Sequence, residues 1–280
     1  MNIVGVGHAG CKVTKEFQNF TEYQTFFIDN ENTNNYKNFI KVTKRATHEE
    51  YEEKYKNLNI KKIIGPATIV LCGSGKITGI LLRLLKQMEK NKLTIIYIKP
   101  DLSSSSELEK KRERLVFGVL QQYARSNILE RLYVISNLEV ESALDQISIS
   151  SYWVDLNKVI ANTYHMLNVL QNTEPMLSSE STPPVTSKIA TLGVVNYESL
   201  KEKIFYDLER PRLKKYFFVV CEETLNKEKD LLQKIRSYVK KKSQKEEKCS
   251  ASFGIYSTEY KQDYVYTLHY ATFVQEENIY

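Results

Sequence analysis

The sequence predicts an α/β fold: a mostly parallel sheet in the first half, then a long central helix and a smaller α+β region. Three observations predict it. In the first 150 residues, short apolar runs alternate with helical patterns, which is typical of parallel strands joined by helices. A helical periodicity then extends over residues 152–171 without interruption. Beyond residue 188, strand-like runs follow one another with a single helix among them, which favours an antiparallel or mixed sheet.

The first half contains five apolar runs that predict strands, at residues 2–5, 24–29, 67–71, 93–98 and 131–135. Three helical patterns lie among them, at 11–20, 77–90 and 106–126. The pattern at 77–90 begins apolar nearly all round, so we expect that helix to be buried. Residues 1–150 are therefore predicted to form the first domain.

The second half begins with the central helix, which we place at residues 151–172. Residues 173–187 are rich in Ser, Thr and Pro and are predicted to form a loop or linker. Residues 188–280 are predicted to form the smaller α+β domain. Its elements are strands at 189–197, 215–220, 251–257 and 263–273 and a helix at 225–242, which ends in the lysine cluster Lys240–Lys242.

The bulk composition is that of an ordinary globular chain, with 280 residues, 42% of them hydrophobic. The formal net charge of +6 is mild, so a solvated surface explains it and we find no clear signal for nucleic-acid binding. Four widely spaced cysteines without a CxxC pair indicate neither a zinc site nor a disulfide framework, and we assign no metal ligand. No apolar run approaches the roughly 20 residues of a membrane span. The first strand begins at once, so we expect a cytoplasmic protein without a signal peptide.

The first of two glycine-rich turns follows the strand at residues 2–5. Gly5, Gly7 and Gly10 form the pattern GxGxxG and open a helix. Glycines allow a tight turn there, and the start of a helix offers free N–H groups to a phosphate. Asp29 ends the next strand, where a Rossmann domain holds the ribose of its dinucleotide. One hypothesis is therefore an NAD(P)-dependent oxidoreductase, although no acid/base pair is evident in the second half. The other simple interpretation is a turn without a ligand.

The second turn follows the strand at 67–71 and reads Gly73-Ser-Gly-Lys-Ile-Thr-Gly79. A Rossmann domain needs no second phosphate cradle at this point. The turn is not a Walker A loop, because isoleucine follows Lys76 and because Val70 occupies the place of the required earlier glycine. Its successive backbone N–H groups would still form a concavity for an anion. Two such turns in one α/β domain indicate a diphosphate or triphosphate held from two sides.

Together the turns resemble the phosphate loops of the tubulin/FtsZ superfamily. Gly5-Val-Gly-His-Ala-Gly-Cys11 is similar to the first loop, GVGGAGxN, and the turn at 73–79 keeps three glycines and the second threonine of GGGTGTG. Ile95-Ile-Tyr-Ile-Lys-Pro100 is similar to the strand with a TKP-like end, and Tyr133-Val-Ile-Ser-Asn137 resembles the IPN segment. Trp153-Val-Asp-Leu-Asn157 resembles the stretch YGDLN of the central helix.

This resemblance implies a guanine-nucleotide-binding protein that takes GTP or GDP with Mg²⁺ and pairs with itself in head-to-tail filaments. Trp153 and Asn157 stand one helical turn apart, so both can meet one planar base. The amide of Asn157 offers the donor and the acceptor that guanine needs. A core tryptophan and a solvent-facing asparagine are the alternative. The resemblance places these residues in the nucleotide site: Gly5, Gly7, His8, Gly10, Cys11, Gly73, Ser74, Gly75, Lys76, Thr78, Gly79, Arg112, Asn137, Trp153 and Asn157.

Two parts of the family pattern are missing. In the superfamily, acids in the loop after the central helix polarise a water on the nucleotide of the next subunit. Residues 175–188 contain one acid, Glu180, and no aspartate. Water needs a positioned base to attack a phosphoryl centre efficiently, so we assign no catalytic residue and expect weak or absent GTP hydrolysis. The third, glycine-rich phosphate loop has no counterpart at 42–48. These losses motivate another hypothesis, a structural or interaction protein that keeps the fold without nucleotide.

Overall fold

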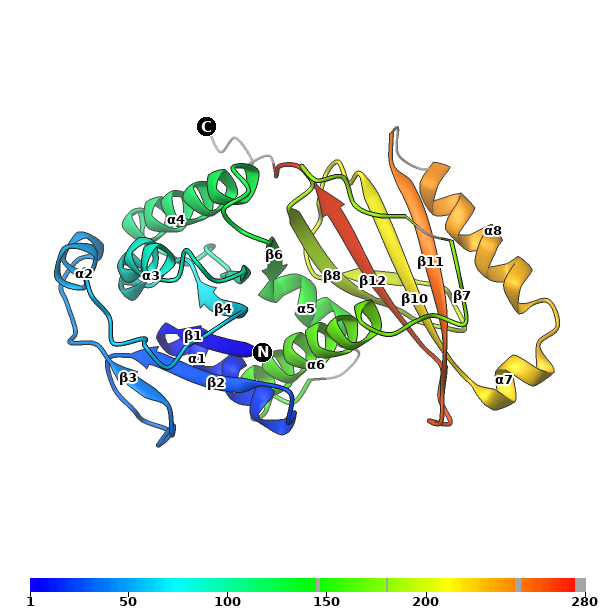
Figure 1. Cartoon of the computed structure of the whole chain (residues 1–280), viewed down its shortest axis with the longest axis horizontal. Helices are drawn as coiled ribbons and strands as arrows, with labels where there is room; N and C mark the ends of the chain where they lie inside the picture. Colours follow the sequence, from blue (N-terminus) through cyan, green and yellow to red (C-terminus); the bar gives the residue numbers. More distant parts are fainter. Residues whose placement is uncertain (145–146, 180, 245–247, 275–280) are drawn as a thin grey trace.

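Within the described residues, the fold is built on one continuous mixed sheet of 12 strands (Figure 1). The structure is a computed structural model and describes residues 1–144, 147–179, 181–244 and 248–274. Eleven strands follow the order β3-β2-β1-β4-β5-β6-β8-β12-β10-β11-β7, and β9 pairs with β8. The first six are all parallel to their neighbours. Beyond β8 the pairing is mixed, with antiparallel β8–β12 and β12–β10 and parallel β10–β11. The predicted α/β fold class is confirmed.

The strands in the described residues are two to nine residues long. In chain order they are β1 (Asn2–Val6), β2 (Gln24–Asp29), β3 (Phe39–Lys41), β4 (Ala67–Cys72), β5 (Leu93–Lys99), β6 (Arg131–Ser136), β7 (Leu177–Ser178), β8 (Ile189–Val195), β9 (Glu202–Ile204), β10 (Leu213–Cys221), β11 (Ser250–Thr258) and β12 (Tyr264–Ala271).

The helices connect these strands and cover the sheet. They are α1 (Gly7–Glu16), α2 (His48–Lys54), α3 (Leu81–Gln87), α4 (Glu107–Arg125), α5 (Asn137–Ala143), α6 (Tyr152–Gln171), α7 (Glu222–Lys227) and α8 (Leu231–Gln244), with short 3₁₀ segments η1 (Phe17–Asn19) and η2 (Lys76–Ile80).

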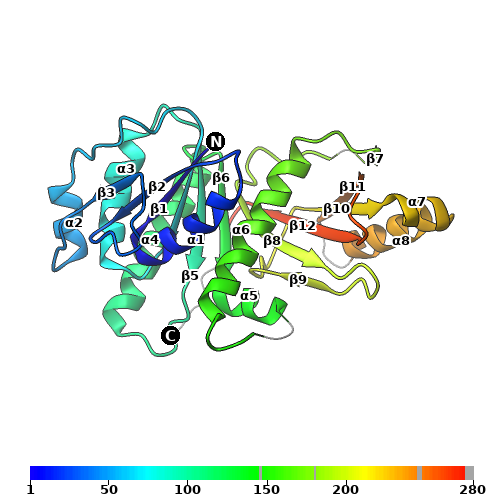
Figure 2. The same cartoon turned by 90° about the horizontal axis from the view of Figure 1, so that it is seen from below.

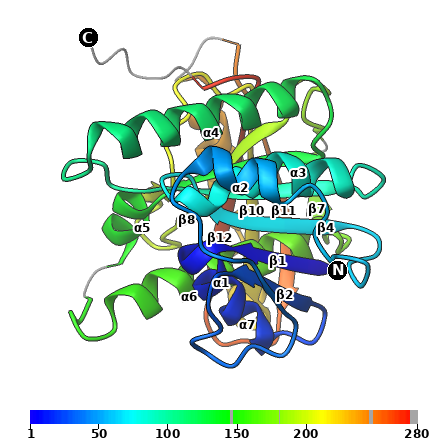
Figure 3. The same ribbon diagram turned by 90° about the vertical axis from the view of Figure 1, so that its left-hand side faces the viewer.

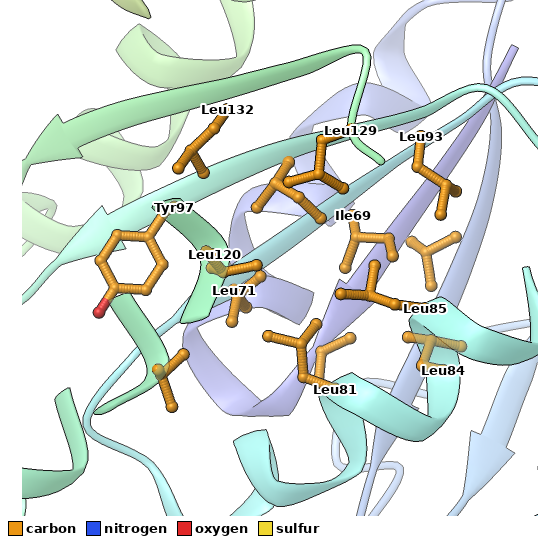
Figure 4. Close-up of a cluster of buried hydrophobic side chains, with 14 of the residues drawn as sticks. Ile69, Leu71, Leu81, Leu84, Leu85, Leu93, Tyr97, Leu120, Leu129 and Leu132 are labelled. Atoms are coloured by element: carbon orange, nitrogen blue, oxygen red, sulfur yellow. The ribbon is translucent and has the colours of Figure 1, made fainter. Parts of the chain in front are cut away.

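Both faces of the parallel part of the sheet are covered, which explains its apolar strands. On one face Leu84 of α3 and Leu120 of α4 pack with Ile69 and Leu71 of β4 (Figure 4). On the other face α1 and α6 pack over Val70 and its neighbours. Successive residues of β4 therefore point into different cores, as the alternation of a strand requires.

The central helix α6 joins the two halves of the chain. Figure 2 shows it between the first strands and the strands that follow β8. Its buried face, which includes Ile160 and Leu167, belongs to the same apolar cluster as Phe17 of η1 and Leu268 of β12. The helix therefore fixes the second half of the sheet against the first.

The helix predicted at 225–242 is two helices, α7 and α8. The hydroxyl of Thr224 donates to Asp263 Oδ2 at 2.8 Å, and the backbone N–H of Cys221 donates to Asp263 Oδ1 at 2.7 Å. These bonds tie the start of α7 to the beginning of β12. Helix α8 instead packs Ile235 and Val239 against the sheet. Two separate anchors explain the interruption, which local periodicity did not predict.

No helix in the described ranges is long and apolar enough to cross a membrane. No disulfide joins the four cysteines in the part of the chain that the structure describes.

Candidate functional site

The candidate site lies along the carboxyl edge of the parallel strands. Four neighbouring strands end there almost in register, since Val6 pairs with Leu71, Cys72 with Ile98, and Lys99 with Ser136. The loops and helices that follow β1, β4, β5 and β6 therefore begin side by side. Ligands of open α/β sheets bind outside this edge.

The first glycine turn begins α1 immediately after β1. Gly7 has a φ of +70°, a conformation that favours glycine. A Cβ at Gly10 would stand 2.2 Å from the carbonyl oxygen of Val70, so only glycine lets α1 lie this close to β4. The N-cap residue, Val6, offers no side-chain hydrogen bond, and the first N–H groups of α1 are left to another partner. This end of the helix can receive an anion.

The second glycine turn continues from β4 into η2. The guanidinium of Arg112 donates to the carbonyl oxygen of Ser74 at 2.6 Å, and the hydroxyl of Thr78 donates to the carbonyl oxygen of Gly75 at 2.7 Å. A Cβ at Gly79 would stand 2.0 Å from the carbonyl oxygen of His48, the first residue of α2. The turn is therefore fixed by α4 on one side and α2 on the other.

The two turns lie against each other. A Cβ on Gly7 would stand 2.7 Å from Cγ2 of Ile77. The strands that lead into the turns are neighbours, with Gly5 paired to Val70. The two turns are therefore adjacent at the carboxyl edge.

Three residues behind the second turn were missed by sequence reasoning. The hydroxyl of Tyr97 donates to Glu113 Oε1 at 2.9 Å, and Lys99 Nζ lies 3.6 Å from the same oxygen. A Cβ at Gly73 would overlap the Tyr97 hydroxyl at 1.8 Å. Tyr97 thus packs against the second turn at Gly73, a position where only glycine fits. Tyr97 and Lys99 lie in the segment 95–100 that resembles the family strand, but their partner Glu113 is distant in sequence, so the contact gave no local signal.

Several predicted site residues use their side chains inside the protein. Cys11 is buried, and its thiol donates to the carbonyl oxygens of Gly5, at 3.5 Å, and Ile28, at 3.7 Å. Burial raises the pKa of this thiol. With Thr78 and Arg112 also bonded to the main chain, these side chains shape the turns. Gly75, His8 and Lys76 are exposed, and Ser74 is half-buried.

Asp29, the residue of the Rossmann hypothesis, ends β2 and is half-buried. Burial raises the pKa of its carboxyl, and Oδ1 accepts a 2.8 Å hydrogen bond from the N–H of Asn30. The strand order β3-β2-β1-β4-β5-β6 is also that of a doubly wound dinucleotide-binding sheet. The first half alone therefore does not separate the two nucleotide hypotheses.

The residues predicted to contact a base follow β6 and begin α6. Asn137 is the first residue of α5 and is half-buried at the carboxyl edge. Trp153 has 56% of its surface exposed, and its ring meets that of Tyr152 edge-on at 5.0 Å between centroids. Asn157 is half-buried on the same helix. The Tyr152 hydroxyl donates to Glu141 Oε2 at 2.7 Å, which joins α6 to α5 and raises the pKa of Tyr152 to about 12. The exposed indole is open to a ligand and is not part of the core.

The loop after α6 crosses to the far edge of the sheet. Within it, Leu177 and Ser178 pair with Ile255 and Gly254 as the edge strand β7. Glu180 lies outside the described residues. Within the parts of the chain that are described, no group of three or more His, Cys, Asp or Glu could hold a metal ion.

Solved structures with this arrangement can be aligned with nearly the whole chain. The FtsZ dimer of M. jannaschii covers 96% of this chain and 87% of its own, with 13% identity and a TM-score of 0.69. The GTPγS-form protofilament of TubZ from Bacillus thuringiensis serovar israelensis covers 98% and 86%, with 13% identity and a TM-score of 0.70. This chain has a tubulin/FtsZ-like fold. The GTPγS-bound protofilament of CetZ2 from Haloferax volcanii covers 99% and 94%, with 12% identity and a TM-score of 0.68.

At identities this low the likeness shows the fold alone. Neither the protein-family models nor the curated proteins contain a match to the sequence.

Proposed function

We propose that this chain binds guanine nucleotides in the cytoplasm and assembles head to tail with itself, with weak or absent GTP hydrolysis. The contact of the two glycine turns at the carboxyl edge is the observation that supports this most directly. Solved proteins of the same fold include a GTPγS-form TubZ protofilament and a GTPγS-bound CetZ2 protofilament.

In this proposal the main chain binds the phosphates. The first N–H groups of α1, which have no side-chain cap, would face the anion from one side, and those of Gly73 to Gly75 would face it from the other. Lys76 is exposed in the second turn and adds positive charge. Magnesium would be bound through the nucleotide phosphates and water, as is usual for this ion in nucleotide sites.

The base would lie farther along the same edge. Asn137 follows β6, which is three strands away from β1 in the sheet. At the usual spacing of strands, Asn137 and Gly7 are therefore separated by roughly 14 Å across the sheet. Trp153 would cover one face of the guanine, and Asn157 would bond its edge. The exposure of Trp153 supports this role, because the ring is not used by the core.

Weak hydrolysis follows from the sequence of the loop after α6. Residues 175–188 contain Glu180 as their single acid. The edge strand β7 uses part of this loop to pair with β11. A slow general-base step is therefore expected even where the nucleotide binds.

Titration with fluorescent GTP, GDP and ATP analogues tests the proposal, with Trp153 emission as a second readout. Saturable binding that prefers guanine supports it, and no response to millimolar GTP overturns it. Enhanced NADH fluorescence would instead favour the oxidoreductase hypothesis. Sedimentation with and without GTPγS then tests assembly.

A nucleotide-free structural protein is the second candidate. The observation in its favour is that the side chains of Arg112, Thr78 and Cys11 already donate hydrogen bonds to main-chain carbonyl oxygens. Filaments that form equally well after removal of all nucleotide would support this alternative.

A further inference from the structure

A cavity of about 260 Å³ lies in the second half of the chain. It is bounded by β10, by α8 and by the turn at residues 196–201 that joins β8 to β9. Figure 1 shows α8 at the opposite end of the molecule from α2, and in Figure 3, which faces the α2 end, β10 and β11 lie behind the first strands. The cavity is therefore separate from the candidate nucleotide site.

The walls of the cavity are apolar and aromatic. Phe218 of β10 and Ile235 of α8 line it and belong to the buried cluster between the sheet and α8. Tyr197 and Tyr238 also line it, so three of its side chains are aromatic. An apolar protein cavity of about 150 Å³ can bind benzene. Sites for drug-sized molecules usually measure about 300–1,000 Å³. This cavity therefore has room for one aromatic ring with a small substituent.

Two hydroxyl groups of this lining have no hydrogen-bond partner. The side-chain oxygens of Tyr197 and Tyr238 are buried and unpaired within the described ranges. Burial raises the pKa of both tyrosines, so both hydroxyls stay protonated near neutral pH and can donate. Buried polar groups in proteins are normally paired. A ligand with an acceptor oxygen would supply the partner that these hydroxyls lack.

The turn beside the cavity holds a leucine in the left-handed region. Leu200 has a φ of +54°, which favours glycine, and its side chain packs on the buried cluster and lines the cavity. The N–H of Leu200 donates to the carbonyl oxygen of Asn196 at 2.9 Å, and the N–H of Ser199 donates to Asn196 Oδ1 at 2.8 Å. Backbone strain of this kind is concentrated at functional sites. Here it places an apolar side chain at the cavity.

The charges at the cavity disfavour an anionic ligand. Glu198 and Glu228 line it, with Lys234 as the one cation among the described lining residues. Lys234 Nζ lies 3.3 Å from Glu228 Oε2 and 3.3 Å from Asp230 Oδ1, so its charge is already balanced. Glu198 is exposed and adds a further negative charge. A negatively charged molecule would therefore be repelled.

We propose that this cavity binds a small uncharged molecule with one aromatic ring and a hydrogen-bond acceptor such as a carbonyl oxygen. The ring would pack against Phe218 and Ile235, and the acceptor would receive a hydrogen bond from the hydroxyl of Tyr197 or Tyr238. Both hydroxyl oxygens are covered by neighbouring atoms, so these side chains would shift slightly to reach the ligand. The proposal does not depend on nucleotide binding.

Benzamide is a probe of this chemistry, because it has one ring, a carbonyl acceptor and no charge. NMR shifts of the isoleucine methyl groups follow its binding to the full chain, with Ile235 as the reporter in the cavity. We expect saturable shifts of Ile235 at millimolar benzamide, and at least about tenfold weaker binding of benzoate, which has the same size and a negative charge. Absence of a saturable shift with benzamide, or equal binding of benzoate, would overturn the proposal.

The variant Tyr197→Phe/Tyr238→Phe tests the hydroxyls separately from the apolar walls. It should bind benzamide about tenfold more weakly than the unaltered chain, but bind toluene equally well, because toluene has no acceptor. Its free energy of unfolding should not fall, since the two hydroxyls have no partner to lose.

The matched control is Tyr133→Phe. Tyr133 and Tyr238 are both 7% exposed, but Tyr133 lies in the cluster around α6 and does not line the cavity. This variant should bind benzamide as the unaltered chain does. Equal binding of benzamide by all three proteins would overturn the proposal, because the hydroxyls would then not contact the ligand.

Discussion

The Arg112 guanidinium donates a 2.6 Å hydrogen bond to the carbonyl oxygen of Ser74. The two residues are 38 positions apart, and Arg112 is 9% exposed. One side chain of α4 thus sets the shape of the second glycine turn. In the proposed site the arginine is a positioning residue, and it need not touch the nucleotide.

Replacing Arg112 by alanine should weaken both the fold and nucleotide binding. The carbonyl oxygen of Ser74 loses its donor, which costs about 1–3 kcal/mol when the group stays buried. Urea unfolding measures this loss, and GTP titration measures the accompanying loss of affinity. Arg114→Ala is the control, because Arg114 is exposed two residues along the same helix and should change stability by less than about 0.5 kcal/mol. Equal effects of the two variants would contradict the role of Arg112.

The glycines of this chain differ in what surrounds them, which gives a matched pair of variants. In Gly10→Ala the new methyl would stand 2.2 Å from the carbonyl oxygen of Val70, so α1 must move away from β4. We expect a loss of about 2 kcal/mol or more in the free energy of unfolding. Gly118→Ala has no heavy atom within 4 Å of the new methyl and lies inside α4, so it should gain up to about 1 kcal/mol. Relative to the unaltered chain, the denaturant midpoint should fall for Gly10→Ala and rise for Gly118→Ala. Two falls of similar size would contradict this.

Asn157 should decide which base is bound and not how tightly phosphates are held. Asn157→Ala should weaken GTP binding about tenfold and leave ATP binding unchanged, because one base-edge hydrogen bond is lost. Competition titrations with the two nucleotides measure the ratio. Asn162→Ala, an exposed asparagine on the same helix, should change neither. If Asn157→Ala weakens GTP and ATP binding equally, Asn157 does not read the base.

The extent of sequence prediction differs between elements for physical reasons. The central helix was predicted at 152–171, the bounds of α6, because it is long and strongly periodic. The glycine turns were recognised because their requirement for glycine is local. The short elements β3, α2, α5, β7 and β9 gave no clear pattern. The supports of the second turn, Tyr97 and the His48 carbonyl, were also missed, since their contacts join distant parts of the sequence.

The helix predicted at 77–90 is also interrupted, again because of a contact between distant parts of the sequence. Residues 76–80 form the 3₁₀ segment η2, and only then does α3 begin. The tighter turn keeps Gly79 close to the start of α2, a contact that periodicity cannot report.

The partly buried Glu202 should make the stability of this protein dependent on acid pH. His269 Nε2 donates to Glu202 Oε1 at 2.9 Å, and Lys242 forms an ion pair with the other carboxylate oxygen. Burial alone raises the pKa of Glu202, but these two partners outweigh burial and lower it from 4.5 to about 2. The folded state therefore binds this proton less readily than the unfolded chain does. The resulting stabilisation is present above about pH 4.5 and is lost as the pH falls toward 2.

Glu202→Gln should remove most of this pH dependence. Near pH 6 we expect the variant to be less stable by up to about 3 kcal/mol, because Lys242 and His269 lose their charged partner. At pH 2 to 3 the two proteins should converge, because the wild-type carboxyl then becomes protonated. Urea unfolding across this range measures the difference, and Glu198→Gln, at an exposed position, should run parallel to the unaltered chain. A deficit in Glu202→Gln that stays constant from pH 6 to pH 2 would mean that the ion pairs do not stabilise the fold, and that only the shape of the side chain matters.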